Sequence, residues 1–120
     1  LSGPVYHSDY FDVALDYGAG PLVRDGEPKT IRLQIRNTYK VQATINLHWY
    51  LPEGWQVAPS ADGVVFSLPR HLGAPLDVEF TLQAERLPRN VNRMVLELTV
   101  DGRPTVMLLP IILLNGNTMS

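Results

Sequence analysis

The chain has 120 residues, of which 45% are hydrophobic, and its 10 lysines and arginines stand against 12 aspartates and glutamates. This length predicts one domain, because typical domains run to roughly 100–200 residues, and it excludes the large α/β barrel enzymes. A net charge of −2 without any basic run argues against nucleic acid and anionic lipid as partners. Because cysteine is absent, disulfides, thiolate nucleophiles and cysteine-ligated zinc are excluded.

Apolar and polar residues alternate with a period of two along most of the chain. Successive side chains of a strand point to opposite faces, so each such segment has one buried face and one wet face. Helical spacing is not sustained in any segment. We therefore predict an all-β, immunoglobulin-like sandwich of about seven antiparallel strands. In chain order the predicted strands cover residues 11–17, 31–36, 43–51, 64–68, 76–83, 94–100 and 105–114.

Turn residues separate these segments and suggest how the last two strands pair. Asp101-Gly102 is a strong signal for a two-residue hairpin turn, so the strands on either side are expected to be antiparallel neighbours. Pro110 cannot donate a backbone hydrogen bond, which predicts an edge strand or a bulge. We expect the sandwich to span residues 9–115, with a linker or tail over 1–8 and a tail over 116–120.

No targeting or membrane-spanning segment can be recognised in the sequence. Its longest apolar run, residues 106–114, is interrupted by Pro110 and is far shorter than the about 20 residues that span a bilayer. No signal peptide is visible and the chain does not begin with Met, which suggests a piece cut from a longer protein. Neither a cytoplasmic nor a secreted location is favoured.

A short motif resembles a known family of accessory domains. A strand that ends in Asn, a Pro-Glu-Gly-Trp turn and a following short strand resemble the immunoglobulin-like accessory domain of alpha-galactosidases and other glycoside hydrolases. The resemblance covers roughly residues 29 to 100, and its motif consists of Asn37, Pro52, Glu53, Gly54, Trp55, Val57 and Pro59. It implies a non-catalytic domain attached to a hydrolase of glycosidic bonds.

The chain departs from that family in two places. Residues 70–75 stand where the family has a Pro-Gly turn, and the ending from Gly102 to Val106 is not part of its pattern. This ending is similar to the C-terminal domain of some bacterial ADP-ribosylglycohydrolase-like proteins, which implies the same accessory role. Independently of any family, Gly54 allows a turn with positive φ and Trp55 is expected to cover one end of the core.

No constellation of residues indicates catalysis. Asp12 and Asp16 would lie about 13 Å apart along one strand, too far for a pair of glycosidase carboxylates. The histidines His7, His48 and His71 show no metal-ligand spacing, and no serine lies in a nucleophile-elbow motif. We predict that the isolated domain is not an enzyme and needs neither a metal nor a cofactor.

Two surfaces are candidates for binding. Asn46, His48 and Tyr50 would line one exposed strand face, where an aromatic ring beside polar groups suits a sugar. The last strand is apolar on both faces, and we expect Met107, Leu109, Ile111 and Leu113 to form an interface with the catalytic domain or with a second copy. The first hypothesis is therefore an accessory docking domain. The alternatives are a carbohydrate-binding module and an adhesion or scaffold repeat of a surface protein.

Overall fold

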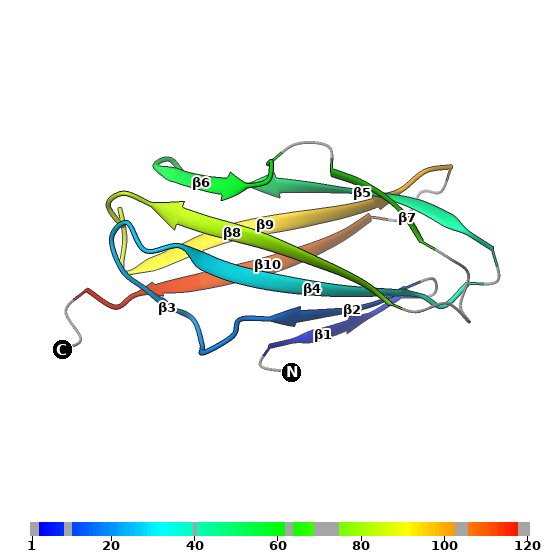
Figure 1. The fold of residues 1–120 in the computed structure, drawn as a ribbon, viewed down its shortest axis with the longest axis horizontal. Coiled ribbons are helices and arrows are strands. Elements are labelled where there is room, and N and C mark those ends of the chain that lie inside the picture. The colour runs from blue at the N-terminus through cyan, green and yellow to red at the C-terminus, as the bar shows by residue number, and fades with distance from the viewer. Residues whose placement is uncertain are drawn as a thin grey trace.

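The computed structural model describes residues 3–8, 11–39, 41–61, 64–68, 75–102 and 106–117, and every regular element among them is a β-strand. None of the described segments is a helix that could cross a membrane. The strands run along the long axis of the molecule (Figure 1). In chain order they are β1 (Val5–His7), β2 (Phe11–Asp16), β3 (Leu22–Val23), β4 (Lys29–Asn37), β5 (Ala43–Tyr50), β6 (Trp55–Ala58), β7 (Val64–Leu68), β8 (Leu76–Ala84), β9 (Val91–Val100) and β10 (Val106–Asn115).

The strands form two sheets that pack face to face. Sheet A has the order β1-β2-β4-β8-β6, and sheet B has the order β3-β10-β9-β5-β7. All registered neighbours are antiparallel except β3 and β10, which run parallel. The order β2-β4-β8-β6 opposite β10-β9-β5 corresponds to the two sheets of an immunoglobulin constant-type domain. The predicted fold class, an all-β immunoglobulin-like sandwich, is confirmed.

The core lies between the two sheets and follows from the alternation in the sequence. Each long strand directs every second side chain inward, where most of these side chains are fully buried. Trp49 of β5 and Phe80 of β8 meet across the sandwich edge to face, with ring centroids 5.3 Å apart. The core is thus built from both sheets, and each sheet keeps one outward face.

Each of the seven predicted strands is present, but the alternation does not predict β1, β3 or β6, of which only β6 matches the short strand implied by the Pro-Glu-Gly-Trp resemblance. These strands have two to four residues, and so short a segment carries too little periodicity to be recognised. The Asp101-Gly102 hairpin is confirmed as an antiparallel β9–β10 pair, and Gly102 has a φ of 73°. The register pairs Thr99 with Val106, so the connection is longer than a two-residue turn.

The predicted N-terminal boundary of the domain is too late, whereas β10 ends at Asn115, the predicted end of the sandwich. Val5–His7, expected in a tail, pairs with β2, and a Cβ at Gly3 would clash with the backbone carbonyl of Leu15. This close approach requires glycine at position 3. At the other end, the Gly116 N–H donates to the Val23 carbonyl over 2.7 Å. Of the predicted C-terminal tail, residues 118–120 lie outside the described residues.

The predicted interface on the last strand is also wrong. Leu109, Ile111 and Leu113 are 0% exposed and belong to the core, and Met107 is half-buried against it. The reason is the pairing with β9, because Leu109 lies opposite Leu96 and Ile111 opposite Met94, whose side chains point inward. The residues between them in sequence therefore face outward.

This assignment predicts opposite outcomes for two adjacent leucines. Leu109→Ala should lower the free energy of unfolding by about 2–5 kcal/mol, because it leaves a cavity in the core. Leu108→Ala should cost well under about 1 kcal/mol, because Leu108 is 58% exposed. Urea unfolding of the two variants measures both values. Equal losses would contradict the orientation of β10.

Candidate functional site

The sequence-predicted sugar site lies on the outer face of sheet B. Asn46, His48 and Tyr50 all point outward from β5, and the rings of His48 and Tyr50 meet edge to face with centroids 4.5 Å apart. The Tyr50 hydroxyl donates to Glu97 over 3.4 Å, and the Asn46 amide donates to Asp101 over 3.0 Å. Partial desolvation and the nearby Glu97 carboxylate raise the pKa of Tyr50. These polar atoms therefore serve contacts within the protein.

The motif residues have structural contacts. Gly54 has a φ of 89°, which favours glycine, while Glu53 is exposed in the same turn. Trp55 is buried, and its indole N–H donates to Asn92 over 3.4 Å. Pro52 accepts a hydrogen bond from the backbone N–H of Trp55 over 3.2 Å. This turn covers one end of the core, as the sequence predicts for Trp55.

Asn37 organises the connection between β4 and β5. Its side chain is buried, and its amide donates to the Val41 carbonyl over 2.8 Å. Its side-chain oxygen accepts from the Tyr39 N–H over 2.9 Å. Both hydrogen bonds hold the chain where it crosses from sheet A to sheet B, so Asn37 contributes to the fold at a strand end.

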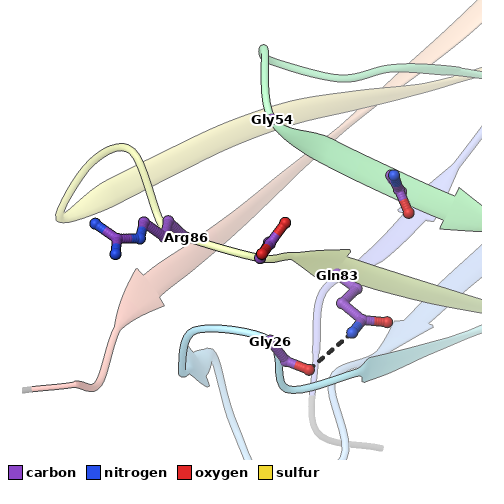
Figure 2. Close-up of a pocket in the computed structure, with 6 residues that line it drawn as sticks. Gly26, Gly54, Gln83 and Arg86 are labelled. Atoms are coloured by element: carbon purple, nitrogen blue, oxygen red, sulfur yellow. Dashed lines mark hydrogen bonds between the residues drawn. The ribbon is translucent and has the colours of Figure 1, made fainter.

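A polar depression of about 790 Å³ opens between β6, β8 and the turn before β4 (Figure 2). The Gln83 amide donates to the Gly26 carbonyl over 2.8 Å, and Figure 2 shows the Arg86 side chain directed away from Gln83. The residues that line the depression are Gly26, Gly54, Gln56, Gln83, Glu85 and Arg86. This lining has amides and charges but no aromatic ring, whereas His48 and Tyr50 lie on the other sheet. The polar groups of this depression and the rings of His48 and Tyr50 therefore do not form one sugar-binding site.

An apolar surface covers the outer side of β10 and its neighbours, and we call it the β10 face. Eight large hydrophobic side chains are exposed in the described part of the chain, and six of them lie on the outward side of sheet B. Tyr50 is one of the six, and the other five belong to the β10 face. The β10 face consists of Leu22, Val91, Val106, Leu108 and Ile112 together with Pro110 and Leu114.

The register explains why these side chains are contiguous. Leu22 of β3 pairs with Leu114, and Leu114 pairs on its other side with Val91. Side chains of registered neighbours lie on the same side of a sheet, so three strands contribute to one apolar surface. The outer face of sheet A is different, since its strands present charged side chains, including the registered pair Arg32 and Glu79, which forms an ion pair.

A second, apolar depression of about 340 Å³ lies beside β10, and we call it the edge pocket. It is lined by Pro4, Tyr17, Gly20, Pro21, Ile112 and Leu114. The Tyr17 hydroxyl accepts a hydrogen bond from the Ile112 N–H over 3.2 Å. Burial raises the pKa of Tyr17, while the hydrogen bond from Ile112 opposes the shift. Because Tyr17 and Ile112 are far apart in the sequence, the pattern of residues carries no signal for this pocket.

The end of β10 is held by a set of hydrogen bonds around Asp25. Its carboxylate accepts from the Leu87 N–H and from the Asn117 amide, each over 2.8 Å. The Asp25 N–H in turn donates to the Asn117 side-chain oxygen over 2.9 Å. These contacts, of which the Leu87 hydrogen bond is the largest cause, lower the pKa of Asp25, and the Arg86 charge adds to them. The segment after β10 is thereby fixed beside β3.

Among the described residues, the acidic and histidine side chains singled out in the sequence are dispersed or engaged in contacts within the fold. No three histidine, aspartate or glutamate side chains of these residues converge as metal ligands. Asp12 and Asp16 both lie on the outward side of β2, where Asp12 pairs with His7 over 2.7 Å. Asp16 accepts from the Gly18 N–H over 2.8 Å. His71 lies outside the described residues.

No protein-family model matches the chain, and no curated protein matches its sequence. Several solved structures share its fold. A FixG-related protein from Vibrio parahaemolyticus aligns with a TM-score of 0.69 at 11% identity, covering 90% of this chain and 98% of that chain. The cupredoxin domain of amoB from Nitrosocaldus yellowstonii aligns with a TM-score of 0.60 at 10% identity, covering 90% and 88%. A conjugative transposon lipoprotein from Bacteroides eggerthii aligns with a TM-score of 0.56 at 13% identity, covering 88% and 98%.

At these identities the likeness shows the fold alone. The chain shares a β-sandwich with these proteins, and such a small all-β fold is consistent with a non-catalytic domain. The likeness to a cupredoxin does not extend to a blue-copper ligand set, which includes a cysteine, because the sequence has none.

The Asp25 contacts predict a local transition in acid. The pKa of Asp25 is lowered in the fold, so its contribution is fully present above the ordinary aspartate pKa of about 3.9. That contribution is lost as the pH falls through the lowered value. The amide resonances of Leu87 and Asn117 should shift together in an NMR titration below about pH 4. In Asp25→Asn this shared transition should disappear, and its persistence would assign it to another group.

Tyr17→Phe should expose the amide of Ile112 without disturbing its neighbour. The variant removes the hydroxyl that accepts the Ile112 N–H, whereas the Leu114 N–H keeps its partner, the Pro21 carbonyl at 2.8 Å. We expect faster hydrogen exchange at Ile112, unchanged exchange at Leu114 and a stability loss below about 1.5 kcal/mol. Faster exchange at both amides would mean that Tyr17 holds the whole edge by packing.

Proposed function

We propose that this chain is a non-catalytic docking module that binds another protein surface through the β10 face. The partner favoured by the Pro-Glu-Gly-Trp resemblance is an adjoining catalytic domain that hydrolyses glycosidic bonds. The activity of that partner stays a prediction, because it rests on the motif alone.

The observation that carries the proposal is the contrast between the two outer faces. The outer face of sheet A is polar and charged along β4 and β8, which suits solvent. The β10 face presents Val106 and Leu108, both more than half exposed, beside Ile112 and Leu22. Contiguous exposed apolar surface of this kind usually marks a contact with another macromolecule. A domain with one apolar outer face suits one-sided docking.

Carbohydrate binding has less support. The polar atoms of Asn46 and Tyr50 are engaged by Asp101 and Glu97, and the two rings meet edge to face. The edge-to-face contact leaves no pair of coplanar rings on which a sugar would stack. An adhesion or scaffold repeat would also use a contact surface, and it stays a prediction.

Because this chain has no native cysteine, a thiol introduced into it can be followed by mass spectrometry of its own peptides, whatever cysteines a longer gene product contains. Leu108→Cys places one thiol on the β10 face, and Thr30→Cys places one at an exposed position of sheet A. The rate of maleimide modification is measured for each variant in the isolated chain and in the complete natural gene product. Docking predicts at least about tenfold slower modification of Leu108→Cys in the gene product, which corresponds to about 1.4 kcal/mol of protection. Modification of Thr30→Cys should be unchanged.

The comparison between the two sheets makes the result decisive. Equal rates for Leu108→Cys in both contexts would overturn docking through the β10 face. Slower modification of both thiols would indicate general enclosure and would also contradict one-sided docking. Saturable binding of an oligosaccharide lost in Tyr50→Ala would favour the carbohydrate-binding alternative instead.

A further inference from the structure

The edge of sheet B beside β10 is only partly occupied. β3 fills this position, but it pairs with β10 only at Leu114 and Asn115. Between Val106 and Ile111, no strand pairs with β10 on that side within the described part of the chain. As far as the described residues show, sheet B therefore has room for one more strand beside residues 106–111 of β10.

The directions of the backbone groups along this edge follow from two hydrogen bonds. The N–H groups of Ile112 and Leu114 point away from β9, since they donate to Tyr17 and to the Pro21 carbonyl. Backbone directions alternate along a strand, so the N–H groups of Val106 and Leu108 point the same way. The carbonyls of Val106, Leu108 and Pro110 share this direction. Five backbone groups therefore face the space for one more strand.

Exposed edge strands normally carry features that prevent pairing with another strand, and β10 has few of them. Natural edge strands carry lysine, other charges, proline or bulges that prevent further pairing. β10 has no charged residue from Val106 to Asn115. Its protection consists of Pro110 and of the Tyr17 hydroxyl on Ile112. The edge pocket lies beside Ile112 and is lined almost entirely by apolar groups, so it can take an apolar side chain at the end of the open edge.

We propose that the open edge of β10, from Val106 to Pro110, binds an extended, uncharged segment of a partner protein by strand addition. Main-chain hydrogen bonds to Val106, Leu108 and Pro110 give affinity, and an apolar side chain of the segment fills the edge pocket. The inference deepens the proposed docking function, on which it rests, by naming the kind of segment that the partner supplies.

Pro110 favours a partner strand over a second copy of this chain. In a two-fold pairing of two β10 strands about Leu108, Pro110 of each copy lies opposite Val106 of the other. Proline has no N–H, so the Val106 carbonyl of each copy is left without a donor. A segment without proline satisfies the carbonyls of Val106 and Pro110 as well as both open N–H groups.

The test separates the backbone of the edge from the side chains of the β10 face. Leu108→Pro removes one outward N–H, and β10 already accommodates proline at the equivalent position two residues later. Leu108→Ala removes the side chain and keeps the N–H, so it is the matched control. The probe is a short fluorescein-labelled peptide of alternating threonine and valine that ends in leucine. The same peptide with alternate amides N-methylated lacks the donors that strand addition requires.

Fluorescence polarisation should report saturable binding of the probe and none of its N-methylated form. Leu108→Pro should bind about fivefold more weakly than Leu108→Ala, as expected for one lost backbone hydrogen bond. Hydrogen exchange at Val106 and Leu108 should be fast in the free chain and at least about tenfold slower with the probe bound.

Three results would overturn strand addition. The first is no saturable binding of the probe, and the second is equal weakening by Leu108→Pro and Leu108→Ala. If either occurs while the thiol of Leu108→Cys is still protected in the gene product, docking through the face stands and the edge proposal alone fails. The third is a dimer in analytical ultracentrifugation whose Val106 and Leu108 amides are already protected, which would assign the edge to a second copy.

Discussion

The alignment of β10 against β9 decides which apolar side chains fill the core and which remain outside. The side chains on both faces of β10 are apolar, so burying either face in the core would stabilise the fold about equally. Backbone hydrogen bonding resolves the choice. Pro110 has no N–H and is tolerated only where a donor is not needed, which is the side away from β9. Side-chain and backbone directions alternate together, so this requirement puts Pro110 outward and Leu109 and Ile111 inward.

Asn92 reinforces the same alignment from inside the sandwich. Its buried amide donates to the carbonyls of Leu113 and Arg89, over 3.2 and 3.0 Å, and its oxygen accepts from the Trp55 indole. A buried amide without partners is costly, so these bonds tie the Trp55 turn, β9 and β10 to one arrangement. The motif turn, which the sequence singles out, thus helps to fix the strand whose orientation the apolar pattern leaves open.

Local periodicity is enough to predict the seven longer strands and the sandwich, and the turn chemistry of Gly54 is enough to predict the burial of Trp55. The orientation of β10 could also have been predicted from the sequence. Leu109 lies opposite a buried β9 residue both in the predicted two-residue hairpin and in the longer connection observed, because the two registers differ by two residues. The edge pocket and the Asp25 contacts are different, since their hydrogen bonds join residues more than 60 positions apart. Short-range patterns carry no information on such contacts.

The edge pocket has a consequence for the two ends of the described chain. Pro4 and Leu114 line the same pocket, so the segment before β1 and the C-terminal part of β10 contribute to one surface of the sandwich. The two strand ends do not leave the sandwich together, since in Figure 1 β1 begins near the middle of the long axis whereas β10 ends toward one end of it. A substitution near either end of the described chain would nevertheless alter one and the same apolar pocket, through Pro4 at the start and Leu114 at the end.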